Sequence, residues 1–235
     1  MKLNKYVVGV FVLPLLVGCF RLAAADPYKG ARQSVVSLRT LPGEGGGTGF
    51  LVRGDASNPV IVTNWHICRE VEEYLYASRA GDFEDLKVKI LGEDPEHDLC
   101  AVAPVPGQVL PLGEEPATLD KLHTLGHPFL TRHPKPVNPT PSDGRYIGEE
   151  EGELGFAPDK GCPSPFSLKE AFPFVVCVAK FVFGNTTAHT YPGNSGSPVL
   201  NEYGEVVGVI NATRDPDDAG SFIPVRYLAK FLEQF

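Results

Sequence analysis

Apolar residues in this chain gather in short runs that are rich in valine and isoleucine and are separated by glycine, proline and polar residues. SVVSLRT (34–40) and GGGTGFLVR (45–53) predict a hairpin. NPVIVTNWH (58–66) predicts a buried strand that ends at His66. LKVKILGED (86–94) alternates apolar and polar residues, which predicts a strand with one solvated face.

The same pattern continues along the chain. HDLCAVA (97–103) predicts a strand opened by Asp98, and FVVCVAKFVF (174–183) predicts another. SPVLNEYGEVVGVINAT (197–213) predicts two apolar strands joined by a tight turn. REVEEYLYASRA (69–80) fits a short helical turn or an extended crossover, and its pattern does not choose between them.

A helical period is clear at the end of the chain. RYLAKFLEQF (226–235) places Leu228, Phe231 and Leu232 on one face, which predicts a short C-terminal helix. Glycine (25 residues) and proline (22 residues) are both frequent, as in chains of many short strands and turns. We therefore predict an all-β chain that ends in a helix. The formal net charge of −8 argues against a nucleic-acid partner.

Residues 1–25 resemble a secretory signal, with Lys2 and Lys5 before the apolar run YVVGVFVLPLLVG. The run is short for a membrane span. Leu-Val-Gly-Cys, ending at Cys19, resembles a bacterial lipobox, in which the cysteine is lipidated and becomes the N-terminus. Ala-Ala-Ala before Asp26 fits ordinary cleavage instead. We expect an exported protein, either a periplasmic or membrane-anchored lipoprotein or a freely secreted one; the place of the cysteine directly after the apolar run favours the lipoprotein.

Candidate chemistry begins at YPGNSGSPVL (191–200), where Ser195 follows a Pro-Gly turn. Gly193 can adopt backbone angles closed to other residues, so the N–H groups of Gly193 and Ser195 can form a concavity that holds an oxyanion. Gly-Asn-Ser-Gly is also a common turn by itself. A serine nucleophile further needs an imidazole to take its proton and a carboxylate to fix the imidazole tautomer. His66 and Asp98 supply these groups.

The order of the three residues separates the candidate folds. An α/β-hydrolase needs a histidine after its serine, but none follows Ser195, and Ser197 replaces the second glycine of G-x-S-x-G. The subtilisin order needs an aspartate before the histidine. Only Asp26 and Asp55 precede His66, and both have loop-like surroundings.

TNWHIC, HDLCAVA and GNSGSPVL resemble motifs of the chymotrypsin-like serine peptidases, most closely the bacterial HtrA and glutamyl-endopeptidase branch. The resemblance implies two six-stranded antiparallel β-barrels with the active site in the groove between them. It implies that Ser195 attacks the scissile carbonyl, that His66 is general base and then general acid, and that Asp98 orients His66. Gly193 then shares the oxyanion hole with Ser195. The resemblance thus implies a serine endopeptidase that acts on proteins or peptides and needs no metal ion or cofactor.

The resemblance also divides the chain, with a first barrel over residues 27–115 and a second over 116–235. The second barrel departs from the family pattern in a long insertion at about 131–175. Within it, 132–144 predicts a proline-dense exposed loop, and 158–173 predicts an irregular stretch. The family pattern ends at the terminal helix, so we expect no PDZ domain.

Substrate-binding residues are implied as well. Asn211 occupies the position of a residue that supports the aspartate, and Ala212 and Thr213 are placed to pair with the substrate backbone as an added strand. Counting back from the serine puts Thr190 on the wall of the primary specificity pocket and His189 at its base. Thr213 and Gly220 flank the opposite side.

This pocket has no acidic residue, so a buried arginine or lysine side chain of the substrate would lack a counter-charge, and cleavage after these residues is not expected. Two alternatives remain. If His189 and Thr190 both face inward, they offer hydrogen bonds to an acidic side chain, as in glutamyl endopeptidases. If His189 turns into the barrel, the pocket is small and nearly neutral, as in HtrA-like enzymes, and accepts Val, Ala or Thr. The later strand favours the second alternative.

Four cysteines remain beyond the leader, and an exported chain permits disulfides. Cys68 and Cys100 each lie two residues after a member of the triad, so contact within the triad brings them together. Cys162 and Cys177 then pair by elimination. Four buried thiols are the alternative, and the absence of C-x-x-C argues against a metal site.

Two rival functions remain open. A non-catalytic binding protein on the same fold would keep the groove without turnover, because fold alone does not fix function. An esterase acting on small substrates would use the same three residues.

Overall fold

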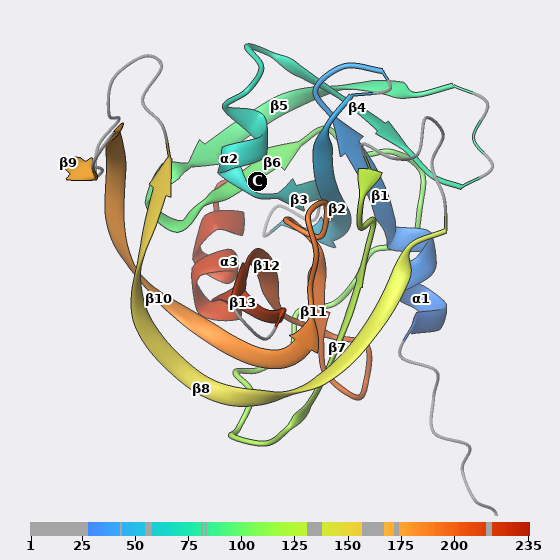
Figure 1. Cartoon of the computed structure of the whole chain (residues 1–235). Helices are drawn as coiled ribbons and strands as arrows, with labels where there is room; N and C mark the ends of the chain where they lie inside the picture. The colour runs from blue at the N-terminus through green and yellow to red at the C-terminus, as the bar shows by residue number, and fades with distance from the viewer. Residues whose placement is uncertain are drawn as a thin grey trace, which may run out of the picture.

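The structure is a computed structural model of a two-barrel protein (Figure 1). It describes residues 28–42, 44–54, 58–80, 82, 84–130, 138–156, 167–171, 174–214 and 218–235. The leader, with Cys19, and Cys162 lie outside the described residues.

Antiparallel strands of the N-terminal half close the first barrel in the order β1-β2-β3-β6-β5-β4. These strands are β1 (Val35–Arg39), β2 (Gly46–Arg53), β3 (Pro59–Thr63), β4 (Tyr74–Ser78), β5 (Leu86–Asp94) and β6 (Leu99–Val102). The first two form the predicted hairpin, with Val35 opposite Phe50. The undecided segment 69–80 contains strand β4, which pairs with both β1 and β5. Its tertiary partners therefore decide its conformation.

The C-terminal half forms a sheet in the order β13-β12-β11-β7-β8-β10-β9, and pairing of β13 with β10 closes it into a barrel. The strands are β7 (Lys121–Gly126), β8 (Thr140–Phe156), β9 (Ser167–Ala171), β10 (Phe174–His189), β11 (Pro198–Leu200), β12 (Val206–Arg214) and β13 (Ala219–Pro224). Within the described residues the closed part has six strands, with β9 added on the outer edge of β10. The predicted fold of two six-stranded antiparallel barrels is thus confirmed.

A long ribbon formed by β8 and β10 sweeps past the barrel in Figure 1. Its pairs run from Thr186 opposite Tyr146 to Cys177 opposite Phe156. The long insertion at about 131–175 stays a prediction. The prediction of a loop over 132–144 is wrong from Thr140 onward, because β8 begins there and pairs with β7. The prediction of an irregular stretch over 158–173 is wrong at 167–171, where β9 pairs with β10. Proline marked these segments as turns, but pairing with neighbouring strands decided their conformation.

A shared apolar core fixes the two barrels against each other. One cluster of buried side chains includes Phe50 of the first barrel and Leu200 of the second. Helix α3 (Val225–Leu232) adds Leu228, Phe231 and Leu232 to the same cluster, the face that its period predicts. Each buried side chain of this size stabilises the fold by about 1.5–3 kcal/mol. Packing therefore holds the two barrels in place against each other.

Three short helical segments complete the fold: α1 (Tyr28–Ser34), α2 (Trp65–Cys68) and the 3₁₀ turn η1 (Pro95–His97). None of the helices in the described part of the chain is long and apolar enough to cross a membrane.

Candidate active site

His66 and Asp98 lie in direct contact at the edge of the first barrel. His66 Nδ1 lies 2.9 Å from Asp98 Oδ2 and 3.1 Å from Oδ1. The backbone N–H of His66 also donates to Asp98 Oδ1 at 2.9 Å. The aspartate side chain is 1% exposed and the histidine side chain 33% exposed. The carboxylate therefore fixes the ring from a buried position and leaves its other face open.

The segment around His66 is a turn of helix, so the prediction that a strand runs to His66 is wrong. Strand β3 ends at Thr63, and α2 begins at Trp65. The backbone carbonyl of Asp98 accepts the Trp65 N–H at 3.0 Å. Because Asp98 satisfies two N–H groups at the start of α2, it holds the chain in this turn.

Asp98 itself lies between η1 and β6 instead of opening the strand. Its φ of 52° is in the left-handed region, which aspartate tolerates better than most residues. His97 pairs with Asp94, with 2.8 Å between Nδ1 and Oδ2, and its ring stacks on Tyr227. It thus has a structural role.

The environment of His66 raises its pKa above the ordinary value of 6.5. Burial of the ring disfavours the charged form and by itself lowers the pKa. The carboxylate of Asp98 acts in the opposite direction, by its charge and by its hydrogen bond, and prevails. The imidazolium is therefore stabilised where a proton-transfer catalyst needs it.

Ser195 lies in a tight turn whose shape depends on Gly193. The φ of Gly193 is 99°, and a Cβ added there would approach the carbonyl oxygen of His127 to 2.4 Å. The Asn194 N–H donates to Tyr191 O at 2.9 Å, and the Thr48 N–H donates to Ser195 O at 2.8 Å. The N–H groups of Gly193 and Ser195 donate to no acceptor in the described part of the chain. They are thus available to a ligand.

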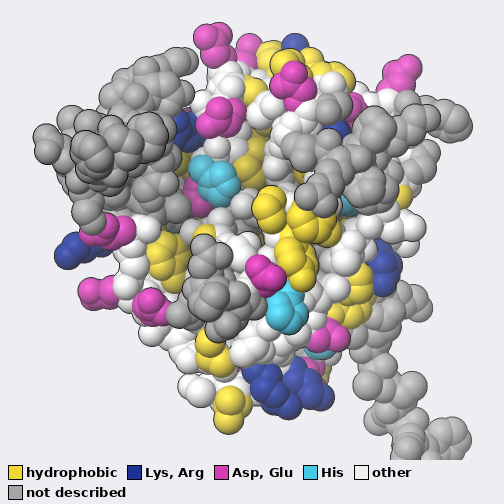
Figure 2. Space-filling view, viewed as in Figure 1, with side chains coloured by type: hydrophobic (Ala, Val, Ile, Leu, Met, Phe, Trp, Pro, Cys, Tyr) yellow, Lys and Arg dark blue, Asp and Glu magenta, His cyan; other side chains and the backbone are white. Residues whose placement is uncertain are grey.

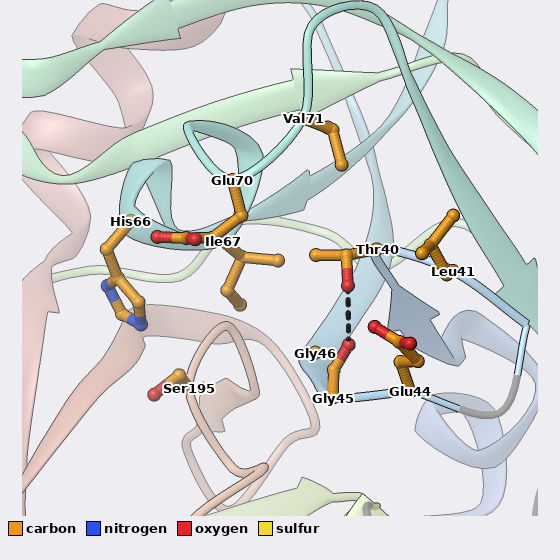
Figure 3. A pocket seen from close by; sticks show the side chains of 10 residues that line it. All are labelled: Thr40, Leu41, Glu44, Gly45, Gly46, His66, Ile67, Glu70, Val71 and Ser195. Atoms are coloured by element: carbon orange, nitrogen blue, oxygen red, sulfur yellow. Dashed lines mark hydrogen bonds between the residues drawn. The ribbon is translucent and has the colours of Figure 1, made fainter. Parts of the chain in front are cut away.

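The hydroxyl of Ser195 is turned toward the second barrel. Its Oγ donates to the backbone carbonyl of Asn211 at 3.4 Å, and no hydrogen bond joins it to His66 within the described residues. Ser195 and His66 nevertheless line the same cavity of about 670 Å³ (Figure 3).

Three of the predicted pocket residues come together. The hydroxyls of Thr190 and Thr213 lie 3.1 Å apart, and Thr213 Oγ1 donates to the Thr190 carbonyl at 3.2 Å. A Cβ on Gly220 would lie 2.8 Å from Thr190 Cγ2. His189 is exposed while Thr190 is fully buried, so the two side chains face opposite ways. His189 therefore neither forms a buried pocket base nor turns into the barrel.

Asn211 and Ala212 lie within β12, near its C-terminal end. The Asn211 side chain is 4% exposed, and within the described residues it has no hydrogen-bond partner, Asp98 included. The predicted support of the aspartate by this side chain is not present. Ala212 and Thr213 are exposed at this strand end.

Cys68 and Cys100 form a disulfide, the pairing expected from their places beside His66 and Asp98. Both are fully buried, and the bond ties α2 to β6. Cys177 is on β10, but its side chain lies outside the described residues, so its pairing with Cys162 stays a prediction.

Sequence reasoning missed Thr48, which connects the barrels at the serine turn. Its hydroxyl donates to Gly193 O at 2.8 Å and accepts the His127 N–H at 2.9 Å. The signal was the glycine run around it, because a Cβ on Gly47 would lie 2.7 Å from Ser195 O. Such a run indicates that another backbone approaches closely.

The two closed barrels, with the histidine and aspartate on the first and the serine on the second, define the chymotrypsin-like fold class. Residues 47–209 match the sequence profile of the trypsin-like peptidase domain. The chain belongs to this family.

Similar curated proteins are named as serine proteases. A probable periplasmic serine endoprotease, DegP-like, from Pseudomonas fluorescens is 27% identical over 168 residues, 69% of this chain and 28% of that protein. The putative serine protease HhoB of Synechocystis is 28% identical over 186 residues, 78% of this chain and 38% of that protein. The matched region thus spans less than half the length of these relatives.

Solved structures share the fold. The Rv3671c protein of M. tuberculosis, a serine-to-alanine mutant in an inactive form, has a TM-score of 0.64 and 24% identity, covering 97% of this chain and 96% of that chain. A serine endoprotease from Yersinia pestis has a TM-score of 0.60 and 18% identity, covering 88% of this chain and 65% of that chain.

Proposed function

We propose that the protein is a serine endopeptidase that hydrolyses peptide bonds through an acyl-enzyme. The observation that carries the proposal is the bond of His66 Nδ1 to the buried Asp98 carboxylate, with Ser195 lining the same cavity. Family membership supports it, since the family and its named relatives are peptidases. Proteins or peptides are then the substrates.

In the acylation step, the Ser195 hydroxyl rotates from the Asn211 carbonyl toward His66 Nε2. His66 takes the hydroxyl proton while Ser195 Oγ bonds to the scissile carbonyl carbon, whose oxygen becomes negative. The N–H groups of Gly193 and Ser195 stabilise this oxyanion. The C–N bond then breaks, and the leaving amine takes the proton from His66.

In the deacylation step, water replaces the amine. His66 takes a proton from the water as its oxygen bonds to the acyl carbon, and the second oxyanion collapses with release of Ser195 Oγ. His66 returns the proton to the serine. Asp98 keeps the ring tautomer constant through both steps and stabilises each imidazolium.

On the acyl side, we propose a pocket formed by Thr190, Thr213 and Gly220 that accepts a small uncharged side chain such as Val, Ala or Thr. Exposed Ala212 and Thr213 are placed to pair with the substrate backbone. Asp218 adjoins the pocket by its backbone, whose carbonyl accepts the Thr190 N–H at 2.8 Å. Sequencing the products of a cleaved peptide library tests the pocket. Dominant cleavage after Arg or Lys would overturn the assignment, and its loss in Asp218→Asn would identify Asp218 as the counter-charge.

The rate of hydrolysis is expected to fall as the pH is lowered, with a midpoint above pH 6.5. The neutral imidazole is the active base, and a raised pKa means that the ring gains its proton at a higher pH than an ordinary histidine. The measurement is kcat/KM for an uncharged peptide across about pH 5 to 9, which covers the range in which an imidazole titrates. A midpoint below 6.5 would contradict the proposed role of Asp98.

A catalytically silent binding module is the second candidate, favoured by the orientation of the Ser195 hydroxyl toward Asn211. Labelling with a fluorophosphonate separates the two, because the reagent needs an activated serine. We expect the wild type to be labelled and Ser195→Ala not to be. An unlabelled wild type that still binds peptides would establish the silent module.

We also propose that the protein is exported and that Cys19 is lipidated. The relative from Pseudomonas fluorescens is named as periplasmic, and the cysteine directly follows the apolar run of the leader. Cys19→Ala is expected to release the protein from the membrane fraction or to leave it unprocessed. An unmodified mature N-terminus at Asp26 would disprove lipidation.

A further inference from the structure

A cavity lies beside the proposed catalytic residues. Besides His66 and Ser195, its walls come from the β1–β2 connection, within residues 40–46, and from α2 and the turn after it, within 67–71 (Figure 3). All these wall segments belong to the first barrel. A volume of about 670 Å³ has room for one or two side chains of a peptide.

The position of the cavity assigns it to one side of the scissile bond. Thr190, Thr213 and Gly220, the proposed acyl-side pocket, do not line it. A peptide whose carbonyl lies at Ser195 has its acyl part on one side of the serine and its leaving amine on the other. Since His66 gives its proton to that amine, the leaving part passes along the wall that His66 shares.

Two carboxylates line the cavity from different walls, Glu44 on the β1–β2 connection and Glu70 after α2. No lysine or arginine lines it in the described part of the chain. Glu70 Oε1 is 3.7 Å from Arg69 Nε, but the Arg69 guanidinium is also held over the Trp65 ring, at 5.5 Å from its centre. The charge of Glu70 also raises the pKa of His66, by less than the charge and hydrogen bond of Asp98 do.

Glu44 forms no ion pair with any described residue. The neighbouring Arg39 is 1% exposed and donates to the backbone carbonyl of Glu44 at 3.5 Å. Neither Arg39 nor Arg69 lines the cavity, so among its described lining residues Glu44 and Glu70 are the ones with a permanent charge. Figure 2 shows acidic side chains along the upper part of the same face, over the first barrel.

Apolar side chains line the same cavity. They are Leu41, which is 51% exposed, Ile67 and Val71. Lysine and arginine carry a cationic head on an apolar stem, which packs on such a surface while the head stays near solvent and counter-charge. An acidic side chain would pack no better and would meet repulsion.

We propose that this cavity binds the leaving-group side of the substrate and prefers lysine or arginine at one of the two residues that follow the scissile bond. The inference rests on the proposed endopeptidase function and names the substrate class for this side of the site. Glu44 and Glu70 are the specificity-determining residues.

The test uses internally quenched peptides with one common acyl side, taken from the best-cleaved library peptide, and Lys, Ala or Glu at the first or second residue after the bond. We expect the wild type to cleave the best Lys peptide about fivefold faster in kcat/KM than its Glu counterpart at low salt, because exposed charge pairs are individually weak. Added salt reduces the ratio. The double variant Glu44→Gln/Glu70→Gln brings it close to unity.

The matched control is Glu72→Gln, which removes an exposed carboxylate from the same turn without touching the cavity and keeps the wild-type ratio. A ratio close to unity in the wild type, or one that the double variant leaves unchanged, overturns the inference. Both results leave the endopeptidase function standing, provided that Ser195→Ala abolishes cleavage. Absence of any Ser195-dependent cleavage removes the function and this subsite together.

Discussion

Ser195→Ala is expected to remove nearly all hydrolysis, with a loss of about 10⁶ in kcat, as in well-studied serine peptidases. His66→Ala is expected to cost about the same, because without its base the hydroxyl keeps its ordinary, weakly nucleophilic state. Asp98→Asn is expected to cost on the order of 10⁴, since the amide leaves the imidazole in the wrong tautomer. Steady-state kinetics on the best library peptide measures all three.

The three effects are expected not to add. Serine and histidine act in one proton transfer, so the double variant Ser195→Ala/His66→Ala loses no more than either single variant. Ser142→Ala, on β8, is a control that keeps full activity. Substantial turnover in Ser195→Ala, with the same product pattern as the wild type, would end the proposed mechanism.

Gly193→Ala is expected to lower kcat by about 10²–10³, the usual effect of losing one oxyanion donor. The φ of 99° is strained for any residue with a side chain, and the new methyl group would lie 2.4 Å from the carbonyl oxygen of His127. A change of the backbone that relieves the strained φ or the clash with His127 would turn the Gly193 N–H away from the oxyanion. KM should change much less, because the interaction is made mainly in the transition state.

Gly148→Ala is the matched control for Gly193→Ala. Gly148 also has a positive φ, 111°, but a Cβ there would meet nothing within 4 Å. It therefore carries the backbone strain without the clash and lies on β8, away from the serine turn. Both variants are compared by thermal unfolding, so that a loss of activity is separated from a loss of fold. An unchanged kcat in Gly193→Ala would remove this residue from the oxyanion hole.

Local patterns predicted much of the fold. Strand β5 has the bounds that its alternation indicates, and the buried face of α3 is the one given by its helical period. These features depend on neighbours a few residues away, whose burial repeats with the period of the element. The disulfide between Cys68 and Cys100 could also be predicted from the sequence, because it depends only on the approach of the two short segments that carry His66 and Asp98.

The tertiary structure alone decided the details of the site. His66 lies on a helical turn because Asp98, 32 residues away in sequence, caps that turn. The outward position of His189, the rotamer of Ser195 and the missing bond from Asn211 to Asp98 likewise depend on contacts between strands. Glu44 and Glu70 share one cavity only because the barrel closes. The sequence by itself determined the types of residue in the site and most of the strands that carry them. Long-range strand pairing and packing determined which of these side chains come into contact. The reason is that the energies of these contacts depend on residues far away in the sequence, which a local pattern does not contain.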